Sequence, residues 1–190
     1  MADAPDEFIK TTLPLPPGHG WQCKPGNNLF IADRGAVAFE TPAKWVVRYE
    51  NKTLSIHDQD PPDDQCRISL TVYRLPPVRG GWKQLPLEKM MADVDRMEKK
   101  SKKRQIALEL HIEQRPDMDL VWADKGTYKD PLNGRPIRCR QILARARLVQ
   151  CLITFEVYEE NAEDFRPAWT DLLATLQLAV PRDITGQVGN

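Results

Sequence analysis

The sequence has no net charge and no long hydrophobic run. Its 190 residues include 27 Lys and Arg and 27 Asp and Glu, so the chain has no overall field that would attract nucleic acid or an anionic membrane. Its apolar runs are far shorter than the roughly 18 residues that a membrane-spanning helix needs. The first ten residues contain acids in place of a basic leader region. We therefore expect a soluble, cytoplasmic protein that binds neither nucleic acid nor membranes.

Motifs that would indicate chemistry are also missing. The four cysteines show no C-x-x-C spacing, which argues against a zinc site or a disulfide scaffold. The sequence contains no G-x-S-x-G, no H-E-x-x-H and no Gly-rich phosphate loop. We therefore expect no catalytic residues, no metal and no cofactor.

The clearest positive pattern lies between residues 149 and 180. Alternate apolar residues, the period of a strand with one buried face, occur at Val149, Cys151, Ile153, Phe155 and Val157. A second apolar stripe, at helical spacing, consists of Phe165, Trp169, Leu172, Leu173 and Leu176. With Asp164 as its N-cap, this helix over 164–177 would place Pro167 in its first turn, where proline is tolerated. We expect the helix to cover the buried face of the strand.

The other patterns predict an α+β domain with a largely antiparallel sheet. A second helix is expected over 86–103. Strands are expected near 36–40, 45–49, 54–56, 68–72, 106–112, 120–122 and 137 onward, the first four as a meander. Prolines and glycines crowd residues 1–28, which predicts an irregular arm. A single domain over 29–182 and a tail over 183–190 complete the chain.

Arginines are concentrated in a hairpin that we expect to centre near Arg145. Arg138 and Arg140 fall on the same face of their strand. Such a row could bind carboxylates or phosphates of a partner. It could equally form the solvent-exposed face of the sheet, with the arginines paired with Glu109 and Glu113.

The same hairpin would bring Cys139 and Cys151 face to face. Cytoplasmic thiols stay mainly reduced, so we expect no disulfide there.

Two tryptophans do not follow either periodicity. Trp21 and Trp82 lie in segments rich in glycine and proline, where an aromatic side chain can serve as an exposed anchor for a partner. Packing under a loop is the alternative. Trp82 joins Arg138 and Arg140 as the predicted partner-binding residues.

The acidic loop after His57 offers oxygen ligands and one imidazole. Pro61 and Pro62 interrupt it, and it lacks the glycine and terminal glutamate of a calcium loop. We interpret it as a solvated loop and predict no metal there.

Three stretches together resemble the Mog1/PsbP-like group over about residues 29–180. They are F-E-T-P-A-K-W (Phe39 to Trp45), L-I-T-F-E-V-Y (Leu152 to Tyr158) and L-L-A-T-L-Q-L (Leu172 to Leu178). What matches is a hydrophobic pattern and a Pro-x-x-Trp turn. The resemblance implies an α/β/α sandwich around an antiparallel sheet. Members of this group are generally not enzymes and include a nuclear-transport GTPase regulator, extrinsic photosystem II subunits and secretion-associated adaptors.

These observations favour an interaction or adaptor domain without catalytic activity. Its protein partner would bind a sheet face or the N-terminal arm. The alternative is a small-molecule-binding or metal-binding protein, or an enzyme, with a pocket beside the sheet near Trp82 or His57.

Overall fold

The computed structural model describes residues 11, 23–50, 53–102 and 109–180. Its helices are α1 (Leu87–Lys102) and α2 (Arg166–Thr175). The strands in these ranges are β1 (Asn27–Ala32), β2 (Val37–Pro42), β3 (Val46–Glu50), β4 (Thr53–His57), β5 (Cys66–Arg74), β6 (Glu109–Gln114), β7 (Asp119–Lys129), β8 (Pro136–Ala146), β9 (Val149–Tyr158) and β10 (Gln177–Leu178). Short 3-10 turns lie at Asp33–Gly35, Trp82–Gln84 and Glu159–Asn161.

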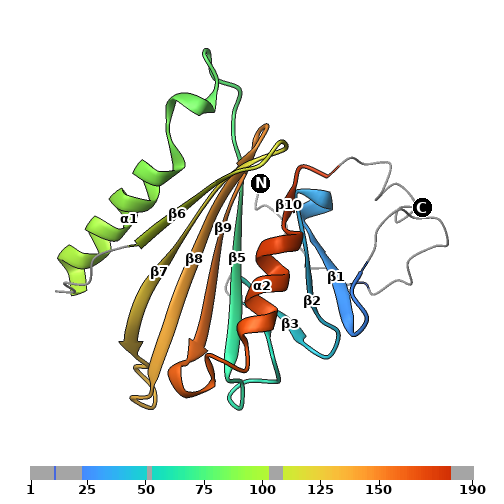
Figure 1. Cartoon of the computed structure of the whole chain (residues 1–190), viewed down its shortest axis with the longest axis vertical. Coiled ribbons are helices and arrows are strands. Elements are labelled where there is room, and N and C mark those ends of the chain that lie inside the picture. The colour runs from blue at the N-terminus through green and yellow to red at the C-terminus, as the bar shows by residue number, and fades with distance from the viewer. Residues whose placement is uncertain (1–10, 12–22, 51–52, 103–108, 181–190) are drawn as a thin grey trace, which may run out of the picture.

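The strands form two antiparallel sheets. The larger has the order β3-β4-β5-β9-β8-β7-β6, and the smaller has the order β1-β2-β10. Helix α1 covers one face of the large sheet, while α2 and the small sheet lie on the other (Figure 1). The predicted α+β class and its α/β/α layering are confirmed, with α2 and the small sheet sharing one outer layer.

The main core lies between the large sheet and the layer that contains α2. Alternation along β9 directs its odd-numbered side chains into this core, where Ile153 and Phe155 are almost fully buried. The stripe of α2 meets them, because Trp169 and Leu172 belong to the same cluster. The strand and helix patterns of residues 149–180 therefore form the centre of the fold, as predicted.

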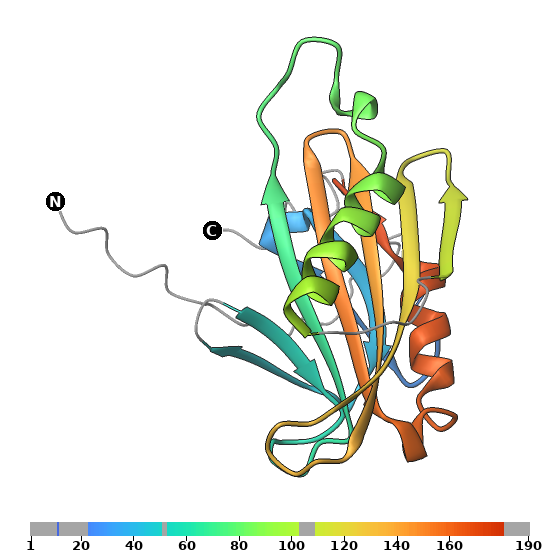
Figure 2. The same ribbon diagram turned by 90° about the vertical axis from the view of Figure 1, so that its left-hand side faces the viewer.

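A smaller core lies under α1. Leu87 and Met91 on the helix pack with Val121 on β7 and Leu143 on β8. The helix crosses only the upper part of this sheet face (Figure 2). The lower part consequently presents polar side chains that α1 does not cover, among them Ser55 on β4 and Arg67 on β5.

Several sequence expectations need correction. The predicted strand at 36–40 corresponds to β2, which pairs with β1 and β10 in the small sheet and is not part of the meander. That meander is β3-β4-β5. β7 spans eleven residues and not the short segment expected. The N-cap of α2 is Phe165, one residue after Asp164, although Pro167 does lie in the first turn.

The predicted arm and tail fall mostly outside the described residues, and so does Trp21. Residues 23–26 at the end of the predicted arm are coil and turn, and β1 begins two residues before the predicted boundary, at Asn27. Lys24 Nζ lies 3.0 Å from Asp171 Oδ2 on α2, and Asn27 Nδ2 donates to the same oxygen at 3.1 Å. These contacts join the beginning of the small sheet to α2.

Candidate functional site

Arg138 and Arg140 lie on the face of the large sheet that carries α2. They share one acid, because each Nε lies close to Oδ2 of Asp124, at 3.5 and 3.4 Å. Arg138 also lies 3.9 Å from Glu159, and the Arg140 guanidinium sits 5.3 Å from the centre of the Trp169 ring. The structure therefore places both arginines on one face, as predicted, and pairs them within the chain.

The acids expected to pair with this row are engaged elsewhere. Glu113 accepts hydrogen bonds from Arg115 and from the Trp122 indole, and Glu109 lies 3.6 Å from His111. The expected pairing with Glu109 and Glu113 was wrong, because Asp124 is the cross-strand neighbour of Arg140 on β7 and contacts both arginines.

The two cysteines of the hairpin do not meet. β8 and β9 are joined at Arg147 and Leu148, so Cys151 pairs with Ala144 and Cys139 pairs with Glu156. Because cross-strand partners share a face and Cys151 and Glu156 are five residues apart, the two thiols lie on opposite faces of the sheet. The pairing is centred between Arg147 and Leu148, about two and a half residues beyond the expected centre at Arg145, and that shift separates the thiols.

Trp82 lies in the connection between β5 and α1, at the upper end of the sheet (Figure 1). Its indole Nε1 donates to the Pro76 carbonyl oxygen at 2.7 Å, which fixes the half-buried ring within its own loop. The loop is tied to the β8–β9 turn, since the Leu75 amide donates to the Leu148 carbonyl oxygen at 2.8 Å. The upper end therefore brings together the end of β5, the β5–α1 connection and the β8–β9 turn, which are distant in sequence.

Apolar side chains are exposed around Trp82. We call them, together with Trp82, the upper surface. They are Tyr73, Val78, Leu85 and Leu148, each between 39% and 45% exposed. Tyr73 stands opposite Gln150 on β9, next to the turn that carries Leu148. Sequence reasoning found only Trp82 in this group, because the register of β5 against β9 is what assembles the rest.

Positive charge accompanies the upper surface. Arg79 and Arg147 are exposed, and Arg145 is buried, with only 4% of its side chain accessible. Arg145 Nη2 lies 3.8 Å from the half-exposed Asp119. The other terminal nitrogen of Arg145, Nη1, has no hydrogen-bond partner among the described residues. A buried cation with one distant acid adds to the positive potential of this end.

The acidic loop after His57 lies at the opposite, lower end of the sheet. Asp58 accepts the backbone amides of Gln65 and Cys66, both at 2.8 Å, which closes the loop. Asp60 pairs with Arg48 on β3. Within the described ranges no three His, Cys, Asp or Glu side chains are grouped as metal ligands. The loop acids instead bind groups of the chain itself.

His57 is held from both ring nitrogens. Its Nδ1 lies 2.8 Å from Oδ2 of Asp64, and its Nε2 lies 2.9 Å from Oγ of Ser55. The imidazole is 6% exposed, whereas Ser55 is half-buried. We call these three residues the lower relay. Sequence reasoning missed it, although a serine and a histidine two residues apart on a strand must share a face.

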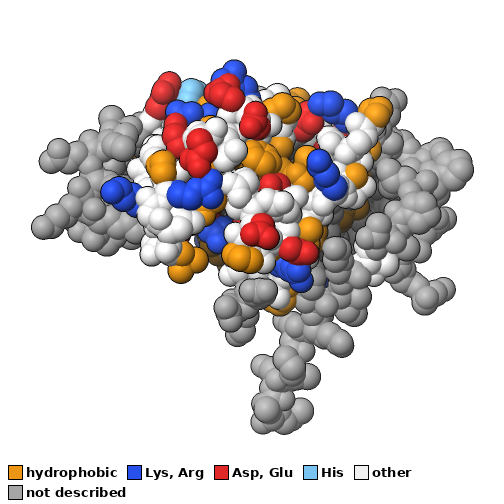
Figure 3. Space-filling view, turned by 90° about the horizontal axis from the view of Figure 1, so that it is seen from below, with side chains coloured by type: hydrophobic (Ala, Val, Ile, Leu, Met, Phe, Trp, Pro, Cys, Tyr) orange, Lys and Arg blue, Asp and Glu red, His pale blue; other side chains and the backbone are white. Residues whose placement is uncertain are grey.

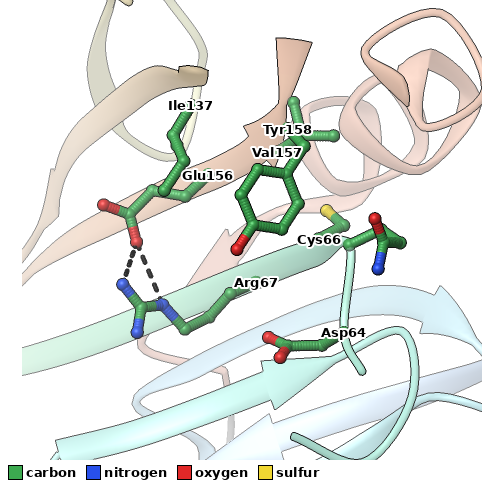
Figure 4. Close-up of a pocket in the computed structure, with 8 residues that line it drawn as sticks. Asp64, Cys66, Arg67, Ile137, Glu156, Val157 and Tyr158 are labelled. Carbon is green, nitrogen blue, oxygen red and sulfur yellow. Dashed lines mark hydrogen bonds and ion pairs between the residues drawn. The ribbon is translucent and has the colours of Figure 1, made fainter. Parts of the chain in front are cut away.

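A small hollow borders the lower relay. It is about 50 Å³ in volume, and Asp64, Arg67, Glu156 and Tyr158 line it. In Figure 4 the Tyr158 ring lies above, and the Arg67 guanidinium points at Glu156. Arg67 Nε donates to Glu156 at 3.0 Å. Pockets for drug-sized ligands measure about 300 to 1,000 Å³, so this hollow admits only a small group.

Two tyrosines near the hollow donate hydrogen bonds to carboxylates. Tyr128 donates to Glu156, and burial together with this bond raises the pKa of Tyr128. Tyr158 donates to Asp130 at 2.6 Å, which lowers the pKa of that carboxyl. Acidic and basic side chains are interspersed over this end, with hydrophobic ones between them (Figure 3). Charges at the lower end are therefore largely balanced, in contrast to the upper end.

The fold resembles that of solved PsbP-like structures. The solution structure of cyanobacterial PsbP (CyanoP) from Synechocystis superposes with a TM-score of 0.60 and 8% identity, covering 85% of this chain and 99% of that chain. A Bacteroides thetaiotaomicron crystal structure gives 0.55 and 9% identity, over 82% of this chain and 49% of that one. At these identities the likeness concerns the fold alone.

The sequence itself defines a narrower group. The family model Alr1449 matches residues 28–181. A Nostoc protein, named uncharacterized protein alr1449, is 30% identical over 177 residues, which cover 92% of this chain and 88% of that protein. The chain belongs to the Alr1449 family. Among its described helices, none is both long and apolar enough to cross a membrane.

Proposed function

We propose that this chain is a protein-interaction domain whose partner binds the upper surface. The observation that carries the proposal is the exposure of Tyr73, Val78, Leu85 and Leu148 around the half-buried Trp82. Scattered exposed apolar residues are ordinary, but several at one end of a sheet, with Trp and Tyr among them, are typical of a binding site. The hydrogen bond from Trp82 to Pro76 satisfies the indole N–H, so the ring can contact a partner without leaving that group unpaired.

Charge defines the chemistry of the partner. Arg79 and Arg147 are exposed next to the apolar Val78 and Leu148, and the buried Arg145 lies 3.8 Å from Asp119. A segment that combines acidic with apolar residues would complement this surface in both respects. Such a partner would bind more weakly as the salt concentration rises, because exposed charges are screened.

A small molecule is less well supported as the ligand. The hollow at the lower end is about 50 Å³, and the upper surface consists of exposed side chains on β5, a loop and a turn. Exposed apolar side chains fit a macromolecular surface better than a metabolite, which needs a concave site.

Selection from a phage-displayed random peptide library with the intact chain tests this proposal. We expect the enriched peptides to combine Asp or Glu with Leu, Phe or Trp. The double variant Val78→Asp/Leu148→Asp should weaken binding of a synthetic enriched peptide at least about tenfold, because it adds like charge and removes apolar contact. Fluorescence anisotropy with the labelled peptide measures the Kd.

Leu132→Asp is the matched control. Leu132 is 93% exposed in the loop between β7 and β8, at the lower end, so its substitution should leave the Kd unchanged. Equal affinities for all three proteins would refute the upper surface as the binding site.

Arg138 and Arg140 provide a second comparison. Their predicted role as a partner surface is tested by Arg138→Glu/Arg140→Glu with the same peptide. Because both arginines are paired with Asp124, we expect a smaller loss of affinity than for the upper-surface variant. A larger loss would move the binding site to this face of the sheet.

A further inference from the structure

Ser55, His57 and Asp64 form a continuous chain of two hydrogen bonds, of 2.9 and 2.8 Å. The order is hydroxyl, imidazole, carboxylate. On unrelated folds this constellation activates a serine oxygen as a nucleophile, and it is recognised by geometry and not by sequence position. No residue of the lower relay takes part in the upper surface, which lies at the other end of the sheet (Figure 1).

The partners of His57 determine where its proton lies. A carboxylate can only accept hydrogen bonds, so in the neutral ring Nδ1 carries the proton and donates it to Asp64. Nε2 is then the unprotonated nitrogen and accepts the hydroxyl proton of Ser55. This is the tautomer that a general base requires, and burial of the ring at 6% exposure keeps its orientation fixed.

The surroundings of Ser55 leave its oxygen reachable. Ser55 is half-buried on β4, on the sheet face opposite the main core, whereas α1 packs on that face against β7 and β8. Its cross-strand neighbours are Arg48 on β3 and Ser69 on β5. β4 pairs with strands on both sides, so its backbone N–H groups are used in the sheet. Stabilisation of a developing oxyanion would therefore come from a side chain, and the cross-strand neighbour Arg48 already pairs with Asp60.

We infer that Ser55 is an activated nucleophile that accepts acyl groups from small activated esters. We expect small substrates because the neighbouring hollow, which Asp64 lines, is only about 50 Å³ in volume. His57 is the general base, and Asp64 is the residue that positions it. This activity would be additional to partner binding at the upper surface.

The reaction proceeds in two balanced steps. Ser55 Oγ attacks the ester carbonyl carbon while its proton passes to His57 Nε2; the ester C–O bond then breaks, and the leaving alcohol takes that proton. Water, deprotonated by the same nitrogen, next attacks the acyl-serine. Its C–Oγ bond breaks, the acid is released, and Ser55 recovers its proton.

A tagged alkyl fluorophosphonate tests the nucleophile directly, since Oγ displaces fluoride and stays bonded to phosphorus. With the full chain, we expect one modified peptide by mass spectrometry, containing Ser55. Ser55→Ala should abolish the labelling, and His57→Gln should slow it at least about 100-fold, as for loss of a general base. Hydrolysis of 4-nitrophenyl acetate should fall in parallel.

Ser69→Ala is the control, because this hydroxyl is adjacent but has no bond to His57; its labelling rate should match that of the unmodified chain. The labelling rate should be low for Asp64→Asn and partly restored for Asp64→Glu. Ser69→Ala and both Asp64 variants should keep the thermal unfolding midpoint of the unmodified chain. If His57→Gln does not fold, the two Asp64 variants decide. Absence of label on Ser55, or equal rates for Asp64→Asn and the unmodified chain, would show that the relay only closes the loop.

Discussion

At the residue scale, Trp169 connects the α2 layer to the large sheet. Its ring packs edge-on against Phe155 and Trp122, with centroid distances of 5.5 Å in both cases, and only 5% of the residue is exposed. Aromatic pairs in this geometry add to the free energy of burial. We expect Trp169→Ala to lower the free energy of unfolding by about 3 to 5 kcal/mol. Urea unfolding followed by circular dichroism measures it.

Leu132→Ala is the comparison for this experiment. Leu132 is almost completely exposed, so the same measurement should change by less than about 0.5 kcal/mol. If Trp169→Ala leaves the free energy of unfolding almost unchanged, the apolar stripe on α2 is not a central part of the core.

Cys151 makes the free energy of unfolding depend on alkaline pH. Burial raises the pKa of its thiol from 9.0 to about 12. Above pH 9 the unfolded chain loses this proton and the native chain keeps it, so the free energy of unfolding falls as the pH rises towards 12. One such proton contributes a slope of at most about 1.4 kcal/mol per pH unit.

The Cys151→Ala variant isolates this contribution. It should unfold more easily at every pH because it leaves a cavity, but its free energy of unfolding should decline less steeply between pH 9 and 11 than that of the unmodified chain. Urea unfolding at three pH values gives the two slopes. Parallel slopes would assign the alkaline instability to other groups, such as the buried Cys66 thiol or Tyr128, whose pKa values are also raised.

At the element scale, the β8–β9 hairpin contains a strained turn. It joins Ala146 to Val149 through Arg147 and Leu148, and Arg147 has a φ of 52°. A left-handed backbone costs a residue with a side chain roughly 1 kcal/mol more than glycine. We expect Arg147→Gly to raise the free energy of unfolding by about 0.5 to 1 kcal/mol, as measured by urea unfolding.

Leu148→Gly is the matched control in the same turn. Leu148 is not among the residues with positive φ, so glycine relieves no strain there and only adds freedom to the unfolded chain. The free energy of unfolding of Leu148→Gly should therefore be unchanged or lower than that of the unmodified chain. A lower free energy of unfolding for Arg147→Gly would mean that contacts of the arginine side chain outweigh the strain of its backbone.

Periodicity predicted the elements with one buried face. β9 and α2 were found because each alternates or repeats with a face in the main core. β1 was missed because glycines and prolines precede it, and β7 was taken as short because Gly126 and a bulge interrupt its pattern. The assignment of β2 to a second sheet depends on contacts with β10, a strand of two residues near the end of the fold.

The candidate sites were less predictable than the elements. Trp82 was selected from composition, but its exposed neighbours come from β5 and the β8–β9 turn, which only the register brings together. Ser55 and His57 share a face by strand alternation, and this part could have been found. The contribution of Asp64 could not, because it depends on how the β4–β5 loop closes around Asp58.

At the scale of the whole molecule, the two sheets share one core. Phe39 on β2 has no exposed surface and belongs to the cluster that contains Ile153 and Trp169. The small sheet therefore contributes to the stability of the large one, and the domain should unfold as a unit. If the two sheets had separate cores, removal of one inner side chain would lower the stability of one sheet only.

Phe39→Ala distinguishes these arrangements. We expect it to lower the free energy of unfolding by about 3 to 5 kcal/mol and to shift the urea midpoints of tryptophan fluorescence and far-ultraviolet circular dichroism together, since Trp45 and Trp169 lie in the shared core. Ile31→Ala, on the same small sheet but 38% exposed, should shift both midpoints only slightly. If circular dichroism changes first in Phe39→Ala and fluorescence keeps its original midpoint, the small sheet unfolds separately and the single core is refuted.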